Sequence, residues 1–292
     1  MSKHLLILGA GFSGKAIGTV FREAGFTVSG TTRAMEKAEA LRALGIDPIL
    51  YDGGTIGEAL AAAMARATHI VQSIAPGKDG DPLFRPGMPA LSILMPKLEW
   101  AGYLSTVGVY GDHKGGWVDE ETKLNPVSAR SIERVEAEDH WLGFGKASGL
   151  PVAVLRLAGI YGPGRNALRN MEEGTARRLV KKDQVFNRIR VEDIGRSALF
   201  LADNALGGIW NIADDEPGPP QDVVAEAARL MGLPIPPDIP FETAELSPMA
   251  RSFYGENKRV SNAKLKTAGF EFRFPNHRQS LAELHSSGRW QG

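Results

Sequence analysis

The chain has 292 residues, of which 43% are hydrophobic, and its 34 basic and 34 acidic side chains cancel to a net charge of zero. This balance gives no electrostatic reason to expect nucleic acid or an anionic membrane as a partner. The sequence contains no cysteine, which excludes disulfide and thiol chemistry and fits a cytoplasmic protein. We expect no signal peptide, because a strand begins by residue 4, and no membrane span, because no apolar stretch approaches roughly 20 residues.

The first thirty residues predict a strand, a turn, a helix and a second strand. Leu5 to Leu8 form an unbroken apolar run, typical of a strand buried on both faces. The glycine-rich segment 9–14, GAGFSG, follows at once, and apolar residues at helical spacing then continue to Gly25. A second strand over residues 27–31 closes the unit.

The three glycines of this turn have distinct physical uses. Gly9 permits a tight turn, Gly11 lets a pyrophosphate approach the backbone, and Gly14 lets the helix pack closely on the strand. The start of the helix then offers free N–H groups and a partial positive charge to phosphates. The segment therefore predicts a dinucleotide-binding site.

Two other interpretations of the same residues stay open. Residues 9–15 also spell the start of a phosphate loop for ATP or GTP, GxxxxGK. The next residue of such a loop should be Ser or Thr, whose hydroxyl binds magnesium, and Ala16 cannot do this. A glycine-rich turn without any ligand is the second alternative.

Strands and helices alternate along most of the chain, which predicts a mostly parallel sheet covered on both faces. The further predicted strands cover residues 48–51, 69–74, 100–105, 152–157 and 208–213. The further predicted helices cover residues 36–44, 56–67, 91–98, 127–146, 166–182, 191–203 and 222–231.

The alternation loosens beyond Pro163, where prolines and short elements predict a smaller second lobe. We expect an α/β fold, a Rossmann-type doubly wound parallel sheet with a mixed C-terminal substrate lobe. The predicted dinucleotide-binding domain covers residues 1–165, and 186–213 return to it. The predicted lobe covers mainly 166–185 and 214–292.

The end of the second strand favours NADP over NAD. A carboxylate at this place would bind the ribose hydroxyls of NAD, but the chain has Thr32 and Arg33, and no acid before Glu36. Arg33 can pair with a 2′-phosphate, although it could also be a solvated residue. Asp52, which ends the third strand, could contact the adenine or only stabilise a turn. The candidate cofactor contacts are Gly9, Gly11, Phe12, Ser13, Gly14, Thr32, Arg33, Asp52 and Ala75.

Several motifs in chain order resemble the extended short-chain dehydrogenase/reductase superfamily, the group of NAD-dependent sugar-nucleotide epimerases and dehydratases. They are the glycine segment 9–14, LSTVGVYG at 104–111, LRLAGIYGPGR at 155–165, VEDI at 191–194 and NIA at 211–213. The resemblance covers nearly the whole chain and implies the fold predicted above.

The resemblance implies that Thr106 binds the reacting oxygen, but the catalytic pair of the superfamily is missing. A tyrosine and a lysine four residues later act in that family, and the matching positions here are Arg130 and Arg134. No tyrosine lies between Tyr110 and Tyr161. An arginine with a pKa above about 12 does not deliver a proton near neutral pH.

The chain therefore resembles an atypical subgroup that keeps the glycine motif and lacks the tyrosine motif. Arg130 and Arg134 could bind an anionic substrate or belong to a salt-bridged helix face. Tyr110 is a candidate substitute acid, and Tyr161 and Arg165 are candidate substrate contacts. We assign no metal, because the histidines show no ligand spacing.

Two functions follow from these residues. The first is an NADP-dependent reductase or epimerase-like enzyme acting on a small polar or sugar-like substrate. The second is a non-catalytic NADP-binding sensor or partner-binding protein. We expect a monomer or a weak dimer.

Overall fold

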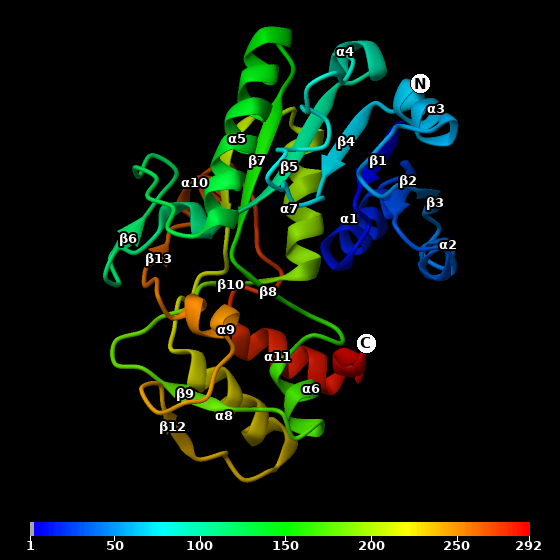
Figure 1. Ribbon diagram of the computed structural model, residues 1–292. Helices are drawn as coiled ribbons and strands as arrows, with labels where there is room; N and C mark the ends of the chain where they lie inside the picture. The colour runs from blue at the N-terminus through cyan, green and yellow to red at the C-terminus, as the bar shows by residue number, and fades with distance from the viewer. Residues whose placement is uncertain (1–2) are drawn as a thin grey trace. The chain divides into compact units, whose positions relative to one another are not determined.

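The computed structural model describes residues 3–292 and contains one large sheet (Figure 1). Its neighbouring pairs β1–β2, β1–β4, β2–β3 and β4–β5 are parallel. The predicted Rossmann-type α/β fold is thereby confirmed. In spatial order the sheet consists of β11 (Gly208–Ile212), β7 (Val152–Leu157), β5 (Trp100–Thr106), β4 (His69–Gln72), β1 (His4–Leu8), β2 (Thr27–Thr32) and β3 (Asp47–Leu50).

The strand order reverses between β1 and β4. From β1 the chain proceeds outward to β2 and β3, and it then returns to form β4 on the other side of β1. The loops that leave β1 and β4 therefore diverge at their carboxyl ends, which is where open α/β sheets bind ligands. The glycine segment 9–14 is the loop that leaves β1.

Helices cover both faces of this sheet, as the alternation in the sequence predicts. The helices between and beside its strands are α1 (Phe12–Glu23), the 3₁₀ turn η1 (Met35–Lys37), α2 (Ala38–Arg42), α3 (Glu58–Arg66), α4 (Leu91–Leu94), the 3₁₀ turn η2 (Val107–Tyr110), α5 (Ala129–Ser148) and α7 (Val191–Asp203).

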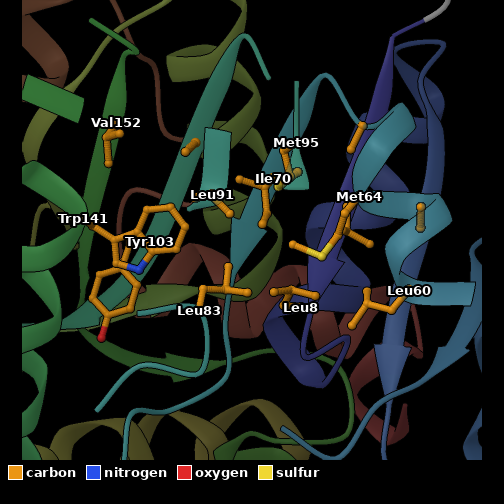
Figure 2. Packing of buried hydrophobic residues seen from close by; sticks show 14 of the residues in the cluster. Leu8, Leu60, Met64, Ile70, Leu83, Leu91, Met95, Tyr103, Trp141 and Val152 are labelled. Atoms are coloured by element: carbon orange, nitrogen blue, oxygen red, sulfur yellow. The ribbon is translucent and has the colours of Figure 1, made fainter. Parts of the chain in front are cut away.

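One face of the sheet buries a continuous apolar cluster under α3, α4 and α5 (Figure 2). Leu60 and Met64 come from α3, and the fully buried Trp141 comes from α5. Trp141 stacks on Tyr103 of β5 with ring centroids 6.1 Å apart. This packing fixes the position of α5 along β5, next to Thr106 at the end of that strand.

A second compact unit contains residues 110–125, 157–193 and 211–292. Leu168, Ala227 and Leu281 belong to an apolar cluster that joins three of its helices. Its elements are β6 (Trp117–Val118), β8 (Gly159–Tyr161), α6 (Ala167–Glu172), β9 (Arg178–Val180), β10 (Arg188–Arg190), α8 (Pro220–Met231), β12 (Asp238–Pro240), α9 (Pro248–Phe253), β13 (Arg259–Val260), α10 (Ala263–Thr267), α11 (His277–Ser286) and the 3₁₀ turn η3 (Arg289–Gln291).

Two predicted helices are shorter than expected. The prediction of a helix over 166–182 is wrong beyond Glu172, because Gly174 takes a positive φ of 66° and β9 then pairs with β12. The helix predicted over 91–98 ends at Leu94, two residues before Pro96. A proline disfavours helical backbone in the residue that precedes it, which explains the early end.

Candidate cofactor and substrate site

The glycine loop is held by β2 as well as by β1. Gly9 has a positive φ of 87°, and its N–H donates to the Thr31 hydroxyl at 2.7 Å. The Ala10 N–H donates to the Thr31 carbonyl at 2.8 Å. Thr31 is almost completely buried, so both bonds are shielded from water. The sequence analysis did not identify Thr31, whose only signal is a hydroxyl near the end of a buried strand.

The space around the three glycines fits the roles expected of them. A Cβ on Gly9 would lie 3.0–3.3 Å from Ile74 and the Ser73 backbone, and one on Gly14 would lie 2.8 Å from the Gly9 carbonyl oxygen. A Cβ on Gly11, in contrast, would meet no atom within 4 Å. Gly9 and Gly14 are thus constrained by the protein itself, whereas the side of Gly11 is open to a ligand.

Helix α1 begins directly after this open residue. Gly11 is its N-cap in extended conformation, and no side chain caps the first turn. The first turn also contains no acidic residue that would repel a phosphate. Its N–H groups and the positive end of the helix dipole are therefore available to bind one. Phe12 and Ser13 form this first turn, as expected for residues that flank a pyrophosphate.

Arg33 lies at the carboxyl end of β2, next to β1 in the sheet. Its side chain is exposed and makes no ion pair or hydrogen bond with any residue of the described chain. Thr32 folds back on the next turn, where its hydroxyl lies 3.3–3.4 Å from the backbone of Ala34. The nearest acid in sequence, Glu36, belongs to the exposed turn η1.

Asp52 and Ala75 follow the neighbouring strands β3 and β4, and both are exposed. One carboxylate oxygen of Asp52 accepts from the Gly54 N–H at 2.9 Å, and the structure thereby gives it the turn-stabilising contact. Its second oxygen has no hydrogen bond with any residue that the structure describes. The glycine loop, Arg33, Asp52 and Ala75 therefore share one edge of the sheet.

Thr106 ends β5 at the same carboxyl edge. Its hydroxyl oxygen accepts from the Gly108 N–H at 3.1 Å, and the residue is half-buried. The hydroxyl hydrogen has no acceptor among the described residues, so it remains available to donate. This is the property that the resemblance requires of the residue that binds the reacting oxygen.

Arg134 points toward β5 rather than toward acidic residues of its own helix. Its guanidinium donates to the Leu104 carbonyl and lies 3.3 Å from the Tyr103 hydroxyl. It also lies over the Tyr103 ring at 5.8 Å. Burial raises the pKa of Tyr103 to about 12, so this phenol remains protonated near neutral pH. Arg134 therefore ties α5 to the strand that carries Thr106.

Arg130 lies one turn earlier, near the start of α5, and is exposed. It has no ion pair or hydrogen bond within residues 3–292, so the salt-bridged helix face considered above is not formed by this residue. The neighbouring Ser131 is buried, and its hydroxyl lies 2.8 Å from the Ser128 hydroxyl. The start of α5 thus presents a guanidinium and two hydroxyls beside the β5 loop.

A buried charged cluster fixes α5 behind these groups. Glu138 pairs with Arg156 of β7 at 2.8 Å, and both side chains are only 2% exposed. The Ser105 hydroxyl donates to Glu138 at 2.5 Å. Ser105 directly precedes Thr106, so the ion pair positions the end of β5. Glu138 was not among the residues predicted from the sequence.

Tyr110 belongs to the second compact unit, whereas Thr106 and α5 belong to the first. It is completely buried, and its hydroxyl donates to the Asn211 side chain at 2.7 Å. This bond gives the phenol a structural role, so we assign it none as an acid.

Tyr161 and Arg165 lie in the second unit, after β7. The Tyr161 hydroxyl is buried, and burial raises the pKa of this phenol. Arg165 is exposed on a turn closed by two backbone bonds with Gly162, at 2.9 and 3.0 Å. Among the described residues, no cluster of three or more potential metal ligands occurs.

The reversed strand order, the open glycine turn and the uncapped helix define a Rossmann-type dinucleotide-binding protein. Comparison with known proteins gives a family match. Residues 98–213 match the NAD dependent epimerase/dehydratase family. Over these residues the chain is similar to that family.

Two further relatives match the chain over nearly their whole length. A structure of a conserved protein of unknown function from Silicibacter pomeroyi DSS has 41% identity and a TM-score of 0.86, over 98% of this chain and 99% of that one. Protein YeeZ from Escherichia coli K12 is 28% identical, over 94% of this chain and 97% of its own length.

A more distant structure shares the fold. It is dTDP-glucose 4,6-dehydratase from Bacillus anthracis in complex with NAD, with 19% identity and a TM-score of 0.76, over 99% of this chain and 96% of that one. In the part of the chain that the structure covers, none of the helices has both the length and the apolar character needed to cross a membrane.

Proposed function

We propose that the protein is an NADP-dependent reductase or epimerase-like enzyme acting on a small polar or sugar-like substrate, with Thr106 binding the reacting oxygen. The observation that carries the cofactor choice is Arg33, an exposed and unpartnered guanidinium at the carboxyl end of β2. A carboxylate at that place would repel a 2′-phosphate, whereas Arg33 can bind it through two parallel hydrogen bonds.

The residues at the edge of the sheet fit a dinucleotide. Gly11 leaves the backbone accessible, and the uncapped first turn of α1 offers N–H groups to a pyrophosphate. Arg33 would hold the 2′-phosphate, and the free oxygen of Asp52 could accept from the adenine amino group. When bound, the nicotinamide would supply a hydride donor or acceptor.

The protein groups near the end of β5 orient and polarise an oxygen rather than deliver a proton from an acidic side chain. The free hydrogen of Thr106 would donate to the substrate oxygen, while the bond from the Gly108 N–H orients the hydroxyl. Arg130 would stabilise negative charge on that oxygen or bind a substrate anion. The proton itself would then come from water.

Calorimetry with NADP⁺ and NAD⁺ tests the cofactor. We expect Arg33→Ala to weaken NADP⁺ binding about tenfold or more and to leave NAD⁺ binding unchanged. Arg42→Ala is the matched control, since Arg42 is an exposed arginine at the end of α2, where the chain returns to the amino edge of the sheet. Failure to bind either nucleotide would overturn the proposal.

Turnover separates this function from a second one, a non-catalytic NADP-binding sensor. The second function is favoured by Arg134, whose guanidinium is used by the Leu104 carbonyl at a position where the family has a catalytic lysine. A screen of sugar nucleotides and small carbonyl compounds should reveal NADPH oxidation or an epimerised product. Tight NADP⁺ binding without any turnover would instead support the sensor.

A further inference from the structure

A polar recess lies at the amino edge of the sheet. The glycine loop lies at the opposite, carboxyl edge, so the two sites are at opposite ends of β1 and β2. The volume of the recess is about 590 Å³, within the usual range for small-molecule sites. In Figure 1 the N label, beside α3, marks this edge. The polar lining residues that carry the argument are His4, Thr27, Ser29, Asp47, Arg66 and Lys97.

The floor of the recess is a hydrogen-bond network whose proton positions can be deduced. The Arg66 Nε–H donates to Nδ1 of His4 at 3.2 Å, so Nδ1 must carry a lone pair. The proton of the neutral imidazole is therefore on Nε2, which lies 3.1 Å from the Ser29 hydroxyl oxygen. Burial, and after it the Arg66 guanidinium, lower the pKa of His4, which agrees with a neutral ring.

This tautomer leaves Ser29 with one unused hydrogen. The Ser29 oxygen accepts from Nε2 of His4 and also from Nη2 of Arg66 at 3.2 Å. Its own hydrogen has no acceptor among the described residues, although Ser29 is only 1% exposed. His4 cannot act as a base toward Ser29, because the nitrogen that faces the hydroxyl already bears the proton. The arrangement therefore excludes a serine nucleophile and produces a buried hydrogen-bond donor.

Two cations complete the lining. Arg66 ends α3 and uses Nε and Nη2 in the network, while an ion pair joins Nη2 loosely to Asp47 at 3.7 Å. Lys97 lies on the loop before β5, is exposed, and has no partner within residues 3–292. Against the single charge of Asp47, the recess has an excess positive charge and a set of donors.

We propose that this recess binds a phosphorylated small molecule, with the phosphate held by Ser29, Arg66 and Lys97. A phosphate accepts hydrogen bonds from several directions and thus matches a buried hydroxyl, a guanidinium and an ammonium group. The volume leaves room for the organic part of the ligand. This site is separate from the glycine loop, so it stands or fails independently of the cofactor.

His4 provides a reporter inside the recess. Long-range ¹H–¹⁵N spectra of the full chain should show His4 protonated on Nε2 and not on Nδ1. Assignment is possible by comparison with His4→Asn. Titration with inorganic phosphate should then shift the His4 signals saturably, and acetate should shift them more weakly because it offers fewer acceptor sites.

The variant Lys97→Glu should weaken phosphate binding at this site by at least about tenfold, since it replaces an attractive charge by a repulsive one. Lys182→Glu makes the same charge change at an exposed, unpartnered lysine of the second unit and should leave the titration unchanged. Three results would overturn the proposal. They are a His4 proton on Nδ1, His4 signals that do not shift when phosphate is added, and equal phosphate affinities of the Lys97→Glu and Lys182→Glu variants.

Discussion

The two ends of the candidate site differ in how far they match the resemblance described above. At the proposed nucleotide end, around the glycine loop and Arg33, three features that suit a dinucleotide are present: the tight turn at Gly9, the open side of Gly11 and the uncapped helix. At the proposed catalytic end, around Thr106 and α5, the positions that the resemblance assigns to a tyrosine and a lysine are Arg130 and Arg134. In the proposed function, cofactor binding and chemistry therefore depend on separate sets of residues.

The proposed catalytic end has a buried polar framework. Glu138 and Arg156 form an ion pair with almost no solvent exposure, and Ser105 donates to the same carboxylate. Arg134 adds a bond to the Leu104 carbonyl. Arg130 is exposed on α5, whereas these interior contacts hold the end of β5 that carries Thr106.

Removing the buried Glu138 carboxylate should have the largest effect, which is on the stability of the fold. We expect Glu138→Ala to lower the free energy of unfolding by about 3–5 kcal/mol, because Arg156 would remain charged and buried without its main partner. Chemical denaturation measures this. Glu136→Ala, an exposed position on the same helix, should change stability by less than about 0.5 kcal/mol. Equal, small losses in the two variants would contradict a structural role for the pair.

Two alanine substitutions in the glycine loop should separate binding from folding. Gly11→Ala should leave the melting temperature unchanged, because its Cβ meets nothing in the protein, and should weaken NADP⁺ binding about a hundredfold by blocking the pyrophosphate. Gly14→Ala should lower stability by about 1–3 kcal/mol, because its Cβ would overlap the Gly9 carbonyl. Calorimetry and thermal unfolding distinguish them, and an unstable Gly11→Ala protein would show that the open side is filled.

Local sequence signals predicted the nucleotide end well, because its parts are contiguous. The strand, the turn and the helix of residues 4–23 are encoded by an apolar run, by glycines and by helical spacing within one segment. The same reasoning could not find Thr31, whose bond to Gly9 spans 22 positions. Nor could it find the contact between Ser105 and Glu138, since only the packing of α5 on β5 brings them together.

The predictions failed where short elements depend on partners far away in the chain. Residues 178–180 form β9 because they pair with β12, sixty residues later, whereas their local composition favours a helix. The short strands β8 and β10 pair with each other in the same way and have no periodicity to reveal them. The hydrogen bonds of such elements come from partners that are distant in the sequence. A local stretch of sequence therefore does not reveal them.

Removing the Thr106 hydroxyl should have a smaller effect, and only on the rate of turnover. If the protein has the proposed activity, Thr106→Val should reduce kcat about tenfold by removing the donor to the reacting oxygen, with little change in NADP⁺ affinity. Thr106→Ser, which keeps the hydroxyl and its bond from Gly108, should restore most of the rate. A serine variant as slow as the valine variant would show that the hydroxyl alone does not sustain turnover, and it would contradict the role of Thr106 as the donor.

Substitution of Arg134 should have the smallest effect. It distinguishes a role of this residue in the scaffold from a role in cofactor binding. Its bonds to Leu104 and Tyr103 lie within the scaffold, so Arg134→Ala should cost about 1 kcal/mol of stability and change NADP⁺ affinity less than about twofold. Arg130→Ala should leave stability unchanged, because Arg130 has no partner in the described chain. If Arg134→Ala instead weakened NADP⁺ binding at unaltered stability, this arginine would act on the cofactor as the lysine of the family does, and the catalytic end would retain more of its ancestry than its side chains suggest.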